Sequence, residues 1–123
     1  MIVGIGTDII EIARIESACK RPSFIQRVFS EHEIEYYNLK NYAIETLASA
    51  FSAKEAASKA LGTGFSGFSM HNIEVIRDKF GKPSLAFNGG ARERFLSIGG
   101  GTAYLSLSHC RGYAVAFVVI ESN

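Results

Sequence analysis

The hydrophobic positions between residues 41 and 61 recur at helical spacing and predict the longest helix of the chain. These apolar positions are Ile44, Leu47, Phe51 and Leu61, and several residues between them are alanines, the strongest helix formers. Steps of four from Phe51 reach Glu55 and Lys59, so a carboxylate and an ammonium lie on the same row as an apolar ring. We expect both charges to face the core or a cleft at its edge. An ordinary i,i+4 ion pair on the helix would have the same spacing.

Alternation with a period of two predicts a strand over residues 2–9 with two different faces. One face is apolar, and the other carries Gly4, Gly6 and Asp8. Because the glycines have no side chains, another backbone or a ligand can approach closely beside Asp8. A purely structural alternative is a capping box formed by Asp8 and Glu11, with Asp8 as the N-cap of a following helix.

Two further strands are predicted near the end of the chain, over residues 102–108 and 113–121. The run 113–121 is apolar on both faces, so we expect it to be central in a sheet or to be covered by another subunit. His109 lies at the end of the first of these strands, and it is either an ordinary loop histidine or, if a cleft is close, part of a functional site. The sequence alone leaves both interpretations of His109 open.

Turn and capping residues place the remaining elements. Ser30 and Glu33 form a second capping box, which predicts a helix through about Leu39. Gly62 ends the long helix as a left-handed cap, although a glycine there could also let phosphate oxygens approach the backbone. The other predicted segments are a hairpin over 72–78 and 82–88, a short helix over 91–96 and a flexible glycine run at 99–101. We therefore expect one α+β domain over residues 1–123, with an antiparallel sheet packed against helices.

Length and composition narrow the class of protein. With 123 residues, of which 47% are hydrophobic, the chain can form one domain with its own core. The 13 basic and 12 acidic residues leave a net charge of +1, which argues against a general polyanion binder. Two cysteines without a C-x-x-C motif favour a reducing compartment, and no membrane-length apolar run is present. We expect a cytoplasmic protein that binds neither nucleic acid nor membrane.

Basic residues gather between residues 14 and 27. The four basic residues are Arg14, Lys20, Arg21 and Arg27, and Glu16 is the only acid among them, so the local charge is +3. Phe24, Val28 and Phe29 add apolar contacts to this segment. An acidic protein partner would suit such a surface. Nucleic acid is a competing partner, but the basic surface is small and no nucleic-acid motif accompanies it. The third interpretation is a charged face that is simply exposed to solvent.

Three motifs together resemble the holo-(acyl-carrier-protein) synthases, the small bacterial members of the 4′-phosphopantetheinyl transferase superfamily. They are G-I-G-T-D-I from Gly4, F-S-A-K-E-A-A-S-K-A-L-G-T-G from Phe51, and L-S-L-S-H ending at His109. Their order and spacing, and the length of the chain, agree with the family. The resemblance runs nearly end to end, and the sequence after Arg27 and the G-K-P at Gly81 add to it.

The resemblance implies transfer of 4′-phosphopantetheine from coenzyme A to a serine of apo acyl carrier protein, in fatty acid biosynthesis, with release of adenosine 3′,5′-bisphosphate. It implies Asp8 and Glu55 as ligands of Mg²⁺, and magnesium is typically held by one or two carboxylates plus substrate phosphates. Lys59 would act on a phosphate oxygen. The serine proton would go either to Glu55 or to a water held by the metal.

The resemblance also bears on coenzyme A, the carrier protein and the assembly. The remaining expected contacts are Gly62 and His109 at the phosphates of coenzyme A, and Arg14, Arg21 and Arg27 at the acyl carrier protein. It implies a homotrimer with each active site in a cleft between adjacent protomers. One alternative is another magnesium-dependent phosphoryl-transfer enzyme. The other is a non-catalytic oligomeric binding module, and a measurement of metal affinity would distinguish this module from either enzyme.

Overall fold

A computed structural model describes the chain from Met1 to Asn123 and confirms an α+β fold built on antiparallel strands. The strands are β1 (Ile2–Glu11), β2 (Ile73–Arg77), β3 (Pro83–Phe87), β4 (Gly100–His109) and β5 (Tyr113–Ser122). The helices are α1 (Ile12–Ala18), α2 (Pro22–Val28), α3 (Glu31–Leu39), α4 (Ile44–Ala60) and α5 (Gly89–Ser97), with a 3-10 turn, η1, at Met70–Asn72. None of these helices has the length and apolar character needed to cross a lipid bilayer.

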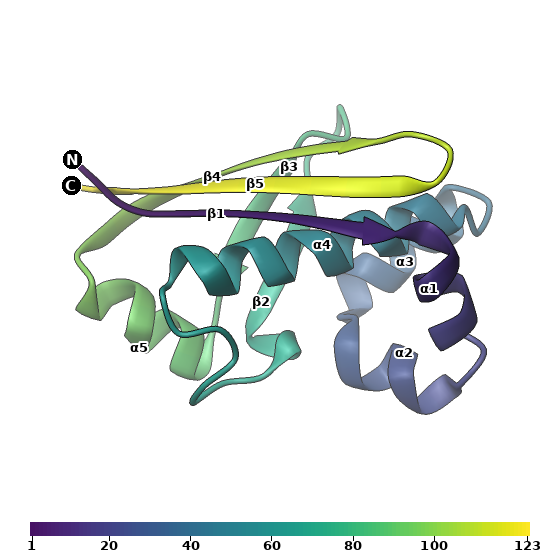
Figure 1. The fold of residues 1–123 in the computed structure, drawn as a ribbon, viewed down its shortest axis with the longest axis horizontal. Helices are drawn as coiled ribbons and strands as arrows, with labels where there is room; N and C mark the ends of the chain where they lie inside the picture. The colour runs from purple at the N-terminus through teal and green to yellow at the C-terminus, as the bar shows by residue number, and fades with distance from the viewer.

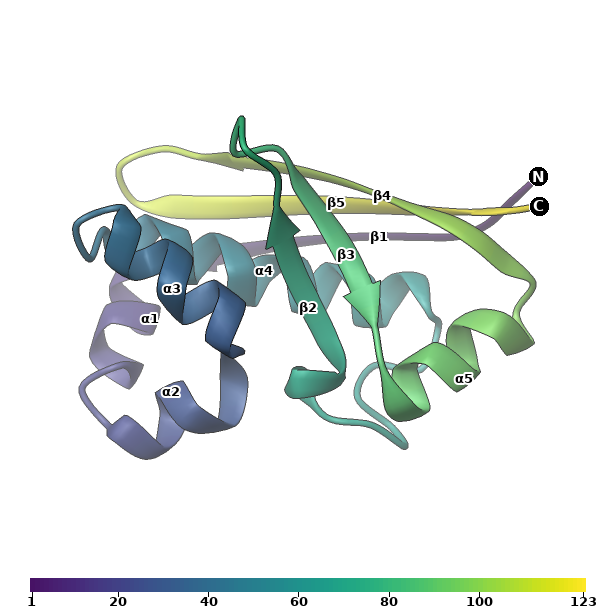
Figure 2. The ribbon, with the colours of Figure 1, turned by 180° about the vertical axis from the view of Figure 1, so that it is seen from behind.

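Three strands form the main sheet in the order β1–β5–β4, and the β2–β3 hairpin is separate. The helices lie on one side of this sheet, and the hairpin runs past the β4 edge with its turn reaching beyond the level of the sheet, as Figures 1 and 2 show from opposite directions. The two chain ends lie together because Ile2 pairs with Glu121 across the antiparallel β1–β5 ladder (Figure 1). The other side of the sheet is left uncovered within the chain.

The contact between β1 and α4 depends on two glycines. A side chain at Gly4 would overlap the carbonyl oxygen of Ala60, and one at Gly6 would overlap that of Ala56. The predicted close approach beside Asp8 is therefore confirmed, and the backbone that approaches is that of α4. This contact fixes the distance between the strand that carries Asp8 and the helix that carries Glu55.

The long helix is confirmed, and most of its surface is buried. Leu47 and a series of alanines are almost fully enclosed, and Phe51 is partly buried against the core. The charged residue of α4 that lies inside the core is Lys54, which is fully buried, whereas Glu55 is half-buried and Lys59 is exposed. Glu55 and Lys59 therefore lie at the edge of the core and not inside it, and Lys59 Nζ contacts Asp8 and Thr7 on β1 there.

Lys54 forms a buried ion pair with Glu33, with 2.9 Å between Nζ and Oε1. The ammonium also donates to the carbonyl oxygens of Met70 and Ile73. Glu33 completes the predicted capping box with Ser30, and its Oε2 accepts a bond of 2.7 Å from the Val75 N–H. Burial lowers the pKa of Lys54, and the Glu33 carboxylate opposes that shift. The pair joins α3, α4 and β2.

The last strand is central in the sheet, as its apolar pattern predicted. Ala114, Ala116, Val118 and Ile120 face the core and are fully buried. On the opposite face, 47% of Phe117 is exposed, and Ile5 and Ile9 on the neighbouring β1 are 61% and 64% exposed. One apolar face of the sheet thus has no cover within the chain.

Three local predictions were wrong. Asp8 is not an N-cap: β1 continues to Glu11, which precedes α1 without a side-chain cap, because Asp8 pairs with Ala116 in the sheet. The glycine run is not a flexible linker, since Gly100 and Gly101 begin β4 and a side chain at Gly100 would overlap Phe95. The aromatic residues of the basic segment are not surface contacts. Phe24 and Val28 on α2, and Phe29 directly after it, are buried in the core.

The hairpin and the short helix are confirmed with modest changes. The hairpin pairs Ile73 with Phe87 and Arg77 with Pro83. The predicted helix over 91–96 extends by two residues at its start and one at its end to form α5.

Candidate active site

Asp8 is held against α4 by two side chains. Ser52 Oγ lies 3.0 Å from Asp8 Oδ2, and Lys59 Nζ lies 3.4 Å from Asp8 Oδ1. Ser52 and Lys59 are seven residues apart, which is about two helical turns, so they lie on the same side of the helix. Lys59 also donates to the carbonyl oxygen of Thr7 at 3.0 Å. The ion pair of Lys59 is therefore with Asp8, and the ordinary i,i+4 pair with Glu55 is not formed.

Glu55 lies one turn before Lys59 on the same side of α4, close to Asp8 on β1. Burial raises the pKa of Glu55, the Asp8 carboxylate raises it further, and Lys59 lowers it. The three predicted catalytic residues are thus close enough to influence one another. The electrostatic field of Asp8 disfavours a second negative charge on Glu55, and a cation between the two carboxylates would relieve that repulsion.

The two carboxylates suit a magnesium ion that is bound partly by substrate phosphates better than a metal ion bound by protein ligands alone. No group of three or more His, Cys, Asp or Glu side chains is arranged to hold a metal ion. Magnesium usually keeps several waters and is bound through one or two carboxylates together with substrate phosphates. Asp8 and Glu55 supply that number of protein ligands. The donor chemistry of the two carboxylates suits the magnesium site, which stays a prediction.

Gly62 lies just beyond the last turn of α4. Its φ of +82° is the left-handed conformation expected of a helix stop. Its N–H donates to the Lys59 carbonyl oxygen at 3.0 Å, and Arg94 Nε donates to the Leu61 carbonyl oxygen at 2.8 Å. The N–H of Gly62 is therefore already used. A phosphate contact here would depend on close approach to the glycine Cα.

His109 does not join the carboxylates within one chain. The β5 residue Ala116 pairs with Asp8 on one side and with Leu107 on the other, so one whole strand separates β1 from β4. Two strand spacings amount to roughly 10 Å, and His109 is two residues further along β4. His109 is exposed at the end of that strand.

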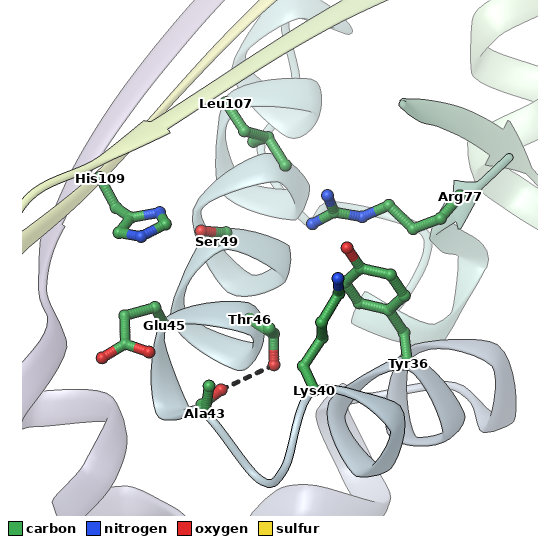
Figure 3. Close-up of a pocket in the computed structure, with 9 residues that line it drawn as sticks. All are labelled: Tyr36, Lys40, Ala43, Glu45, Thr46, Ser49, Arg77, Leu107 and His109. Atoms are coloured by element: carbon green, nitrogen blue, oxygen red, sulfur yellow. Dashed lines mark hydrogen bonds between the residues drawn. The ribbon is translucent and has the colours of Figure 1, made fainter. Parts of the chain in front are cut away.

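His109 instead lines a cavity of about 390 Å³ between α3, the start of α4, β2 and β4. Figure 3 shows its imidazole at one side and Tyr36, Lys40 and Arg77 at the other. The sequence analysis missed these three residues because none belongs to a motif. The only signal was Arg77 itself, a cation within a strand pattern that is otherwise largely apolar.

The predicted docking residues are all exposed but do not form one cluster. Arg14 on α1 and Arg21 before α2 border the same surface hollow, together with Ser17 and Ala18. Arg27 lies in the last turn of α2 and does not line that hollow. The basic surface that the structure brings together is therefore the pair Arg14 and Arg21.

Comparison with known proteins decides the family. The model of the 4′-phosphopantetheinyl transferase superfamily matches residues 4–118. The chain belongs to this superfamily. The holo-(acyl-carrier-protein) synthase of Clostridium tetani is 49% identical over 124 residues, which cover 100% of this chain and 98% of that protein. The resemblance inferred from the three motifs is thus confirmed.

Solved structures of the superfamily have the same fold. The holo-(acyl-carrier-protein) synthase of Neisseria meningitidis matches with a TM-score of 0.89 and 34% identity, over 99% of this chain and 100% of that chain. The Helicobacter pylori synthase, crystallised in complex with coenzyme A, matches with a TM-score of 0.83 and 32% identity, over 95% and 99% of the two chains.

Proposed function

We propose that this protein transfers 4′-phosphopantetheine from coenzyme A to a serine hydroxyl of an apo acyl carrier protein. The full-length match to holo-(acyl-carrier-protein) synthases carries this proposal. In the reaction, the serine oxygen bonds to the phosphorus that bears pantetheine. The bond from that phosphorus to the oxygen of adenosine 3′,5′-bisphosphate breaks, and the serine proton passes to a base, for which Glu55 and a water molecule are the candidates.

Three side chains have the chemistry for this step. Asp8 and Glu55 would hold Mg²⁺, which when bound would neutralise charge on the pyrophosphate of coenzyme A. The side chain of Lys59 is 54% exposed, and its ammonium has only carbonyl and carboxylate partners on β1, so it can turn toward a phosphate oxygen. Ser52 would keep the Asp8 carboxylate oriented. Glu55 is also a candidate acceptor of the serine proton, because burial and Asp8 raise its pKa and so make its carboxylate a stronger base.

We further propose that the enzyme is a homotrimer and that adjacent protomers share each active site. The uncovered apolar face formed by β1 and β5 supports an oligomer, because exposed apolar patches of this kind mark interfaces. The separation of His109 from Asp8 supports a shared site, since one chain does not bring both to one cavity. In a closed ring with head-to-tail contacts, the carboxylates of one protomer would face the His109 cavity of its neighbour.

The direct test is to mix the protein with coenzyme A, Mg²⁺ and an apo acyl carrier protein and to weigh the carrier by mass spectrometry. The expected result is a gain of one phosphopantetheine group on the carrier. Controls are a carrier whose acceptor serine is replaced by alanine, and a reaction with EDTA. A carrier of unchanged mass would contradict the proposal, and protection of the protein by ATP rather than by coenzyme A would indicate another phosphoryl-transfer enzyme.

A further inference from the structure

Ser52 on α4 is fully buried, and its hydroxyl bonds across to β1. Its Oγ lies 3.0 Å from Asp8 Oδ2 and 3.1 Å from the Asp8 carbonyl oxygen. A serine inside a helix often donates to a carbonyl of its own helix, as Ser58 does to Glu55 at 2.7 Å. The single proton of the Ser52 hydroxyl is instead shared between two acceptors, and both belong to Asp8.

The packing of β1 on α4 explains why this hydroxyl meets Asp8. Gly6 lies against Ala56, because a side chain at position 6 would overlap the Ala56 carbonyl oxygen. Two residues further along the strand is Asp8, and four residues back along the helix is Ser52. These steps cover roughly 6.5 Å of strand and about 6 Å of helix, so the two residues meet. The same step taken the other way leads to Gly4 and its contact with α4.

The two carboxylate oxygens of Asp8 are held unequally. Oδ2 accepts from the buried hydroxyl of Ser52, where the low dielectric strengthens a hydrogen bond. Oδ1 has only the longer contact of 3.4 Å to Lys59 Nζ, on a side chain that is 54% exposed. Exposed ion pairs of this kind contribute little. Oδ1 is therefore the oxygen whose protein partner a bound cation can displace.

This inference rests on the proposed function, in which Asp8 and Glu55 hold Mg²⁺. Carboxylates that bind a metal are oriented by hydrogen bonds from neighbouring groups, and losing such a group costs roughly 10- to 100-fold in metal affinity or activity. We propose that Ser52 is a positioning residue, which holds Asp8 Oδ2 against α4 and leaves Oδ1 to bind Mg²⁺ when Lys59 turns toward a phosphate. Because Ser52 is fully buried, it acts through Asp8 and not on the substrate.

The first test needs neither metal nor substrate. The chain has two aspartates, Asp8 and Asp78, so a protein labelled with ¹³C-aspartate gives one set of NMR signals from each. Couplings between Hα and Hβ report the side-chain rotamer. Asp8 should show a single rotamer in wild type and averaged couplings in Ser52→Ala. Asp78, whose Oδ1 accepts from the Phe80 and Lys82 N–H groups, is the internal reference and should not change.

Two further variants separate the hydrogen bond from other effects of the substitution. Ser52→Cys fills the same place with a weak donor and should behave like Ser52→Ala. Ser97→Ala removes a hydroxyl that bonds to the Arg94 carbonyl oxygen on α5 and should match wild type. A single Asp8 rotamer in both Ser52 variants would overturn the proposal. A cysteine variant that matches wild type would overturn it too, since volume and not donation would then fix Asp8.

The second test follows the Mg²⁺ requirement of transfer. In Ser52→Ala, the Mg²⁺ concentration for half-maximal rate should rise about tenfold, and the rate at saturating Mg²⁺ should approach that of wild type. An unchanged requirement in an active variant would refute the positioning role alone. A wild type that transfers nothing would refute the proposed function, and the couplings would still decide whether Ser52 holds Asp8. Alanine is a strong helix former, and thermal unfolding checks that the fold is intact.

Discussion

At the scale of single residues, the proposed chemistry depends on two carboxylates that the fold brings to one edge of α4. Asp8 is fixed by Ser52 and Lys59, whereas Glu55 is partly buried beside them. The pKa of Glu55 is raised above its ordinary value of 4.5 by burial and by Asp8. The folded protein therefore binds this proton more tightly than the unfolded chain does. The stability that follows is fully present below about pH 4.5 and is lost as the pH rises through the raised pKa.

The first prediction follows from that sign. Without metal, Glu55→Gln should be at least as stable as wild type near pH 7.5, because it removes the cost of ionising Glu55 beside Asp8, and the difference should shrink near pH 4. Mg²⁺ should raise the melting temperature of wild type near pH 7.5, and much less near pH 4, because the ligands must be deprotonated. Differential scanning calorimetry at the two pH values measures both effects. A magnesium-induced shift that survives in Glu55→Gln would contradict the assignment.

At the scale of the elements, α4 is joined to α3 and β2 by the buried Lys54–Glu33 pair. Removing one partner leaves an uncompensated buried charge, which is more costly than removing both. We predict that Lys54→Met lowers the free energy of unfolding by about 3–5 kcal/mol. The double variant with Glu33→Leu should lose less than the sum of the two single variants, although Glu33→Leu also gives up the bonds of Glu33 to the Ser30 and Val75 N–H groups. Urea denaturation measures both values, and a double variant that loses the sum of the two single losses would show that the charges are not coupled.

A second prediction at this scale concerns the surface of α1 and α2. The double variant Arg14→Glu with Arg21→Glu should raise KM for the carrier protein about tenfold, since each reversed charge removes an attraction of roughly 0.5–1 kcal/mol. It should also weaken the salt dependence of that KM and leave KM for coenzyme A unchanged. Arg92→Glu, exposed on α5 at the opposite end of the molecule from α1 and α2 (Figure 1), is the control. Docking would lie elsewhere if KM for the carrier did not move.

Much of the fold, and part of the site, could be predicted from local patterns. Period-two and helical spacings identified β1, α4 and β5, and the glycines beside Asp8 correctly indicated a close approach. The Asp8 capping box was wrong because a four-residue pattern cannot show that the strand continues to Glu11. Local patterns could not predict that Arg77 lies beside Tyr36 or that Glu33 bonds to Val75. Those contacts join residues about 40 positions apart, and only the folded topology brings them together.

At the scale of the whole molecule, the uncovered sheet face and the divided site point to the same assembly. Phe117 stands at the middle of β5 on the uncovered face, 47% exposed and opposite Thr7 and Ser106. We predict that Phe117→Asp dissociates the oligomer and abolishes transfer together, because a desolvated charge would be left unpaired in the interface. Analytical ultracentrifugation and activity assays follow both properties. Ser66→Asp, in an exposed loop, should change neither, and an active monomer would refute the shared site.

Subunit mixing tests most directly whether two protomers build each site. One parent, Asp8→Ala with Glu55→Ala, lacks the carboxylates, and the other, His109→Ala with Arg77→Gln, lacks the cavity groups. Each parent alone should be nearly inactive. When the two are unfolded, mixed in equal amounts and refolded, roughly a quarter of the sites should combine intact carboxylates with an intact cavity, because each half is drawn from the right parent with a chance of about one half. Recovery of about a quarter of wild-type activity is the predicted result. Mixed oligomers no more active than the parents would contradict the shared site.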